Sequence, residues 1–138
     1  MNATEWIEFL QNEGVHIRMS NVSWIGNSSN GAYLWGSDEI LCGPRVNKET
    51  VFHELAHWTG NKKRLNRDIV NNWDPATNDL EESIAWEAVK LMVKRFGGAT
   101  RDYYKYAPRY SSMHSPEVKF FGRQAYEYIC DELDLKGV

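Results

Sequence analysis

The spacing of apolar residues predicts a helix at each end of the chain and short strands that follow the first helix. Residues 4–10 and about 116–133 place their apolar side chains on one face of a helix. Residues 15–20 alternate apolar and polar side chains, as a half-buried strand does. Between residues 32 and 42, two short apolar runs flank a glycine-containing turn, which predicts a β-hairpin.

Two longer helical patterns occupy the middle of the chain. The first covers residues 47–59, with Asn47 suited to cap its start and Gly60 suited to the left-handed position after its end. The second runs from residue 78 or 79 to residue 96, where two glycines close it. The order of helix, strands and then helices predicts an α+β fold with a small N-terminal antiparallel or mixed sheet. The length predicts that residues 1–138 form a single domain.

The first of these longer helices contains the sequence His-Glu-x-x-His. His53 and His57 lie one turn apart on the same helical face, so both imidazoles can be directed at one ion. Glu54 is rotated by about 100° from His53, so it cannot easily join the same tetrahedron but can reach a water on the metal. Zinc-assisted hydrolysis uses this division between two imidazoles and a neighbouring carboxylate. We therefore predict Zn²⁺ ligands at His53 and His57 and a general base at Glu54.

A chance coincidence and a hydrogen-bonded pair of core histidines are the alternatives to a zinc site. A shuffled chain of this composition would contain the pattern in roughly one case in a hundred. Val51, Leu55 and Trp58 supply the buried side of the helix, and the histidines stand mid-helix, where a solvated face more often carries Lys or Glu. These features favour the zinc site.

A catalytic zinc usually has three protein ligands, and a later helix offers two candidates for the third. In one common pattern the third ligand is a histidine six residues after the second, but Lys63 occupies that position and is a poor ligand. Glu81 falls inside the apolar face of the later helix and Glu82 falls at its edge, whereas Ser83 and Glu87 fall on the wet face. Because burying an unpaired carboxylate is costly, a metal or a metal-bound histidine would explain both acids. Exposed first-turn acids, favoured by the helix dipole, are the alternative.

The sequence HELAHWTG at residues 53–60, followed by RLNR at 64–67, resembles the metallopeptidase domain of the plasmid antirestriction protein ArdC. It also resembles related zincin-like domains of phage and mobile-element proteins. Tyr33 and the Asp-Glu-Ile sequence at residues 38–40 are similar to the paired strand that precedes the motif in this family. Residues 81–85 match its Glu-Glu-x-x-Ala pattern.

The resemblance covers about residues 32–96 and implies a zincin-like fold in which Glu82 is the third Zn²⁺ ligand. It makes Glu81 a supporting neighbour or an alternative ligand. In related families the residue after the alanine is often polar and supports a ligand histidine, but here it is Trp86, and Glu81 is the candidate substitute. Larger family members carry an N-terminal domain that binds single-stranded DNA. We do not expect that domain before the matched region, so DNA binding is not carried over.

These residues together predict a zinc metallopeptidase, encoded by a phage or mobile element, that acts on a protein or peptide. The oxyanion that develops on the substrate needs a donor besides the metal, and Tyr110 and His114 are the candidates in the downstream region. One strand of the hairpin is expected to form a sheet edge to which an extended peptide can add as a further strand.

Composition narrows the expected partners and compartment. The net charge of −3 and the pI of about 5.8 argue against an extended nucleic-acid surface. We expect no signal peptide and no membrane span, and hence a cytoplasmic protein, in the host cytoplasm if a phage encodes it. Cys42 and Cys130 lack CxxC spacing and are predicted to be buried free thiols in a reducing compartment.

Two other functions stay open on the sequence alone. One is a zincin-fold antirestriction or binding module in which zinc is mainly structural, although the retention of Glu54 argues against it. The other is a DNA-associated factor that uses the basic run between Lys62 and Arg67. A solvated loop is the alternative for that basic run.

Overall fold

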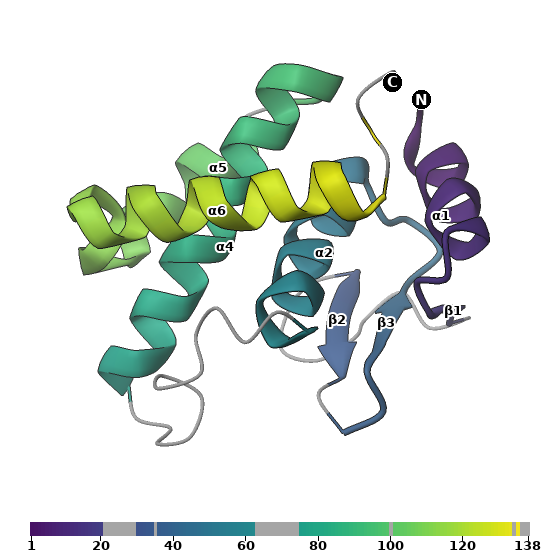
Figure 1. Ribbon diagram of the computed structural model, residues 1–138, viewed down its shortest axis with the longest axis horizontal. Coiled ribbons are helices and arrows are strands. Elements are labelled where there is room, and N and C mark those ends of the chain that lie inside the picture. Colours follow the sequence, from purple (N-terminus) through teal and green to yellow (C-terminus); the bar gives the residue numbers. More distant parts are fainter. Residues whose placement is uncertain (21–29, 35, 63–74, 100, 134, 136–138) are drawn as a thin grey trace.

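The computed structural model describes residues 1–20, 30–34, 36–62, 75–99, 101–133 and 135 (Figure 1). Its helices and strands are, in chain order, α1 (Ala3–Asn12), β1 (Ile17–Met19), β2 (Gly31–Leu34), β3 (Glu39–Cys42), α2 (Lys48–Lys62), α4 (Pro75–Phe96), α5 (Arg101–Tyr106), the 3₁₀ turns η1 (Ala107–Arg109) and η2 (Ser111–His114), and α6 (Pro116–Glu132). None of the helices in the described part of the chain has the length and apolar character needed to cross a membrane.

The sheet has three strands in the order β1-β3-β2. β1 runs parallel to β3, with Ile17 opposite Ile40, and β2 runs antiparallel to β3, with Gly31 opposite Cys42. Of the two predicted forms of the small sheet, antiparallel or mixed, the mixed form is therefore found, and the predicted hairpin is confirmed. β2 lies close to α2 because Gly31 has no side chain: a Cβ there would be only 2.7 Å from Cγ2 of Thr50.

α2 is the central helix of the fold, since it packs against the sheet, α1, α4 and α6 (Figure 1). Its start is capped as predicted, because Oδ1 of Asn47 accepts a 2.8 Å hydrogen bond from the backbone N–H of Thr50. The predicted end at Gly60 is wrong: the helix continues through this residue to Lys62. Glycine lowers the stability of a helix without forbidding it, so a glycine at position 60 did not determine where α2 ends.

α4 begins earlier than predicted, at Pro75, and ends as predicted at Phe96. Gly97 and Gly98 follow with positive φ values of 86° and 134°, which closes the helix. The predicted wet face of α4 is wrong at Ser83 and Glu87, which are both buried. α6 covers that face and approaches so closely that a Cβ on Gly122 would lie 2.6 Å from Cβ of Glu87. The helical wheel assumed one buried face, whereas α2 and α6 bury two.

Two kinds of packing hold these helices together. Near the start of α2, the indole of Trp6 contacts the rings of Phe52 and Phe96 at centroid distances of 5.2 and 5.1 Å. One turn further along, small side chains from α2, α4 and α6 form a separate buried cluster, which consists of Ala56, Ala85, Ala88 and Ala125. The predicted buried free thiols, Cys42 and Cys130, also lie in the interior.

Candidate metal centre

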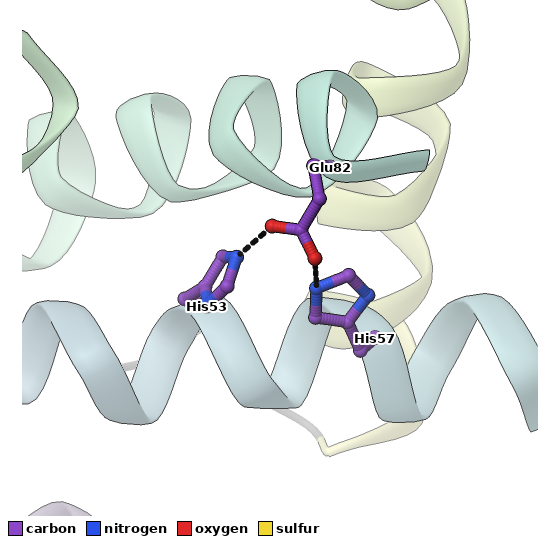
Figure 2. A group of neighbouring side chains, drawn as sticks. All are labelled: His53, His57 and Glu82. Carbon is purple, nitrogen blue, oxygen red and sulfur yellow. Dashed lines mark hydrogen bonds and ion pairs between the residues drawn. The ribbon is translucent and has the colours of Figure 1, made fainter. Parts of the chain in front are cut away.

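His53 and His57 project from one face of α2 toward a single carboxylate on α4 (Figure 2). Nε2 of His53 lies 3.0 Å from Oε2 of Glu82, and Nε2 of His57 lies 3.0 Å from Oε1 of the same side chain. The three residues thus converge, although Glu82 is 29 residues away from His53 in the chain.

The alanine cluster brings the two helices close enough for this convergence. Ala56 stands one turn after His53 on α2, and Ala85 stands one turn after Glu82 on α4. Both alanines are buried in the same small-residue cluster. Because alanine side chains let two helix backbones approach closely, a short glutamate side chain can reach two imidazoles on the facing helix.

The donor set fits a divalent cation. One ligand atom from each of His53, His57 and Glu82 lies within 4.8 Å of the others. Zinc bonds of 2.0–2.1 Å in a tetrahedron separate neighbouring donors by about 3.3 Å, which is close to the 3.0 Å between each histidine and Glu82. Two imidazoles and one carboxylate, all at least partly buried, are the ligand types of a catalytic zinc site.

The electrostatics of the site follow from burial and opposite charges. Burial alone would lower the pKa of His57, but the neighbouring charge of Glu82 and the hydrogen bonds that the ring donates to Glu81 and Glu82 raise it well above its usual value. Burial alone would raise the pKa of Glu82, but the charge of His57 and the hydrogen bonds of both histidines lower it strongly. The carboxylate is therefore ionised at neutral pH and is ready to bind a cation.

Each histidine has a further partner behind it. Oε1 of Glu81 lies 3.4 Å from Nδ1 of His57, on the opposite side of the ring from Glu82. The indole of Trp86 stacks on the His53 ring with a centroid distance of 4.4 Å and an interplanar angle of 21°. The ring of Tyr106 stacks in turn on Trp86 at 5.2 Å.

The sequence reasoning missed this role of Trp86 and treated it only as a departure from the family pattern. A signal was available, since Trp86 follows Glu82 by four residues and therefore shares its helical face. The structure places an aromatic platform at His53, while the carboxylate of Glu81 contacts the other histidine, His57.

Glu54, the predicted general base, is buried beside the same cluster and is only 5% exposed. Its Oε1 lies 3.1 Å from Nδ1 of His53, the ring nitrogen opposite to the one that faces Glu82. Burial raises the pKa of Glu54, but the hydrogen bond and charge of His53 outweigh it, so the pKa lies below its usual value. Its predicted role in proton transfer stays a prediction.

The two candidate oxyanion donors lie in different environments. Tyr110, between η1 and η2, is half-buried near the site. Burial and the charge of Glu82 raise the pKa of its phenol, and an interaction with the Trp86 side chain partly offsets the rise. His114 is exposed at the end of η2, and no hydrogen bond, ion pair or ring contact among the described residues joins it to His53, His57 or Glu82.

Two other predicted features lie away from the three converging side chains, one within the described residues and one largely outside them. Tyr33 and Asp38, which carry part of the family resemblance, meet in the hairpin, where the Tyr33 hydroxyl donates to Oδ1 of Asp38 at 2.5 Å. Of the basic run between Lys62 and Arg67, residues 63–67, including the RLNR sequence, fall outside the described residues. The two alternatives for that run, a DNA contact and a solvated loop, therefore stay open.

Comparisons with known proteins agree with this fold. The family model described as a zincin-like metallopeptidase matches residues 4–107. The crystal structure of the antirestriction protein ArdC from plasmid R388, in its Mn(II)-bound form, is similar with a TM-score of 0.63 and 19% sequence identity. The similarity covers 96% of this chain but only 53% of the ArdC chain, so this chain spans about half the length of that protein. A comparison with curated proteins gives no match. The predicted α+β, zincin-like fold and the predicted resemblance to ArdC are confirmed.

Proposed function

This chain belongs to the zincin-like metallopeptidase family, and we propose that it hydrolyses peptide bonds with Zn²⁺ held by His53, His57 and Glu82. One observation carries the proposal. A carboxylate from α4 reaches Nε2 of both histidines of α2 at 3.0 Å, beside a buried glutamate from the same motif. Two core histidines that were only held in place by Glu82 would not need the second carboxylate, Glu54, beside them.

The residues divide the proposed reaction between them. A divalent metal at this site would act as a Lewis acid that polarises the substrate carbonyl and lowers the pKa of a coordinated water. Glu54 accepts the proton of the attacking water and later delivers it to the leaving amine. Its lowered pKa keeps the carboxylate ionised at neutral pH, as a base requires. Its contact with His53 does not oppose this role, because catalytic hydrogen bonds often become aligned only when substrate binds.

The supporting residues hold the ligands in place. Glu81 orients the ring of His57 through Nδ1, and the stacked indole of Trp86 restricts rotation of the His53 ring. Both restraints reduce the conformational freedom that the ligands would otherwise lose on binding a metal.

We propose that the substrate is an extended segment of a protein or peptide that lies along β2. In the strand order β1-β3-β2, β2 is at one edge of the described sheet. β2 also lies close to the site. The measure of this closeness is that a Cβ added to Gly31 would be 3.3 Å from Cγ of Glu54. A peptide that adds to this edge through backbone hydrogen bonds would therefore pass near the metal ligands.

The second candidate function is an antirestriction or binding module in which the metal is mainly structural. The similarity to the Mn(II)-bound ArdC structure supports it. In this case the metal would join α2 to α4, and Glu54 would serve only to orient His53. The ArdC structure also makes Mn²⁺ an alternative to Zn²⁺.

Metal analysis and a cleavage screen test the proposal together. We expect purified protein to bind one Zn²⁺ or Mn²⁺, measured by mass spectrometry of the metal content, and to lose it on mutation of His53 or His57. We expect new N-termini in a proteome treated with the wild type and none after treatment with the Glu54→Gln variant, which should retain its metal. Equal cleavage by both proteins would contradict the role of Glu54. An antirestriction effect that persists in Glu54→Gln would favour the structural role of the metal.

A further inference from the structure

Tyr110 occupies a rigid position beside the proposed ligands. Its backbone N–H donates to the carbonyl of Ala107 at 3.1 Å, and its carbonyl accepts from the N–H of Met113 at 3.3 Å. These bonds fix the residue between two 3₁₀ turns, and η2 packs against α4. Tyr110 is therefore held by its own segment before any substrate binds.

A carboxylate on α4 fastens this segment to the helix that carries Glu82. Asp79 accepts hydrogen bonds from the backbone N–H groups of Ser111 and Ser112 at 2.9 and 3.1 Å, and from the Ser111 hydroxyl at 3.3 Å. Asp79 precedes Glu82 by three residues, so both carboxylates stand on neighbouring positions of one helical face. Tyr110 immediately precedes Ser111 and Ser112, the two residues that Asp79 binds.

The side chain of Tyr110 is half-buried and packs against the hydrophobic core cluster that includes Trp86. The charge of Glu82 and the Trp86 side chain are among the groups that shift the pKa of its phenol. Trp86 is the residue that stacks on His53. Tyr110 thus lies next to a segment fastened to the helix that carries Glu82, and it packs against the core cluster that contains Trp86.

We propose that Tyr110 is a catalytic hydrogen-bond donor to the substrate carbonyl oxygen, and that Asp79 is the positioning residue that holds it beside Glu82. The inference rests on the proposed function, because it needs a carbonyl bound at the metal centre. A phenol with an ordinary pKa of about 10 keeps its proton at neutral pH, so it can donate to the oxygen as negative charge develops there.

The neighbouring rings are less suited to this role. Tyr106 is held in a stack between Trp86, at 5.2 Å, and the guanidinium of Arg109, at 5.0 Å. Tyr104 is 69% exposed, and His114 is exposed at the end of η2. Among these rings, Tyr110 is therefore the one whose segment is fixed to the helix that carries Glu82.

The test uses Co²⁺ in the full chain and acetohydroxamate as the probe. Co²⁺ reports its coordination by visible absorption, and the hydroxamate carbonyl oxygen stands in for the oxygen of a bound substrate. We expect Tyr110→Phe to leave Co²⁺ affinity and the near-UV circular dichroism unchanged and to weaken acetohydroxamate binding about 10-fold, since one hydrogen bond to a charged group is lost. The matched control, Tyr104→Phe, should bind the probe as the wild type does.

The role of Asp79 is tested by a double-mutant cycle. Asp79→Ala should weaken probe binding, Asp79→Asn should weaken it less because one acceptor oxygen remains, and Asp79→Ala should add nothing in the Tyr110→Phe background. A merely structural effect of Asp79 would be the same in both backgrounds. If Asp79→Ala fails to fold, Asp79→Asn replaces it in the cycle.

The outcomes separate this inference from the function on which it rests. A wild type that binds no Co²⁺, or binds Co²⁺ without the probe, overturns the proposed function and the inference with it. A wild type that binds both, together with a Tyr110→Phe variant of equal probe affinity, overturns the inference alone. Additive effects of Asp79 and Tyr110 overturn the positioning role of Asp79.

Discussion

The two ends of the α2–α4 contact are packed in opposite ways. Near the start of α2, the large rings of Trp6, Phe52 and Phe96 fill the space between α1, α2 and α4. Next to the metal centre, the same two helices meet through Ala56 and Ala85. Large rings bury much apolar area and contribute stability, whereas alanines contribute little area and allow a close approach. The contrast indicates that one end of the pair stabilises the fold and the other sets the distance between the proposed ligands.

The prediction with the largest expected effect concerns a substitution that removes a ring from the aromatic end of the contact and leaves the alanine end unchanged. Trp6→Ala should lower the free energy of unfolding by about 3–5 kcal/mol, because a fully buried aromatic side chain leaves a cavity. Urea denaturation would measure this change, with Phe120→Ala, at a position that is 62% exposed, as the control. Metal affinity of the folded variant should stay within twofold of the wild type. A large fall in that affinity would show that the two ends are not separable.

The second prediction removes the proposed third ligand. A metal at 100 times its dissociation constant should stabilise the wild type by about 2.7 kcal/mol, and a chelator should abolish this gain. Glu82→Gln keeps the size of the side chain but removes its charge and replaces one acceptor oxygen by an amide donor, so the added metal should no longer stabilise the protein. Thermal unfolding with and without Zn²⁺ measures the effect. Glu127→Gln, at an exposed position on α6, should respond to metal as the wild type does.

The third prediction widens the alanine end. Ala85→Leu should lower the free energy of unfolding by about 1–3 kcal/mol, since extra methylenes in a packed site force a backbone shift. The shift should move Glu82 away from the histidines, so metal affinity should fall in parallel. Isothermal titration calorimetry and denaturation would measure both, with Ala85→Ser as a small-residue control. Loss of stability without loss of metal affinity would contradict the spacing role of the alanines.

The smallest expected effect concerns Asp79 and depends on pH. Burial is the largest single influence and would raise the pKa of Asp79, but the hydrogen bonds from Ser112 and Ser111 together lower it below its usual value. A group with a lowered folded-state pKa adds stability above its unfolded pKa, about 3.9, and this stability is lost as the pH falls through the folded value.

Asp79→Asn should therefore cost about 1 kcal/mol or less at pH 7, because solvent screens this carboxylate, and the difference from the wild type should disappear as the pH falls through the lowered pKa of Asp79. Denaturation at a series of pH values measures it, and Glu8→Gln, at an exposed position of α1, is the control. A difference that is constant across this pH range would mean that the charge of Asp79 is not responsible.

Local sequence determined the parts of the site that belong to one helix. The spacing of His53 and His57 places both imidazoles on one face of α2 because helical periodicity is a property of adjacent turns. The same periodicity indicated that Glu81 and Glu82 stand near the buried face of the next long helix. The hairpin and the cap at Asn47 followed from local signals of the same kind.

Only the tertiary structure decided how separate elements meet. It placed Glu82 between the two Nε2 atoms and Glu81 behind His57, a distinction that adjacent glutamates do not reveal in a sequence. It buried Ser83 and Glu87 under α6, stacked Trp86 on His53, and fastened the segment after Tyr110 to Asp79. The physical reason is that periodicity reports which face of one element is apolar, whereas these contacts depend on which second and third elements cover it, and at what distance.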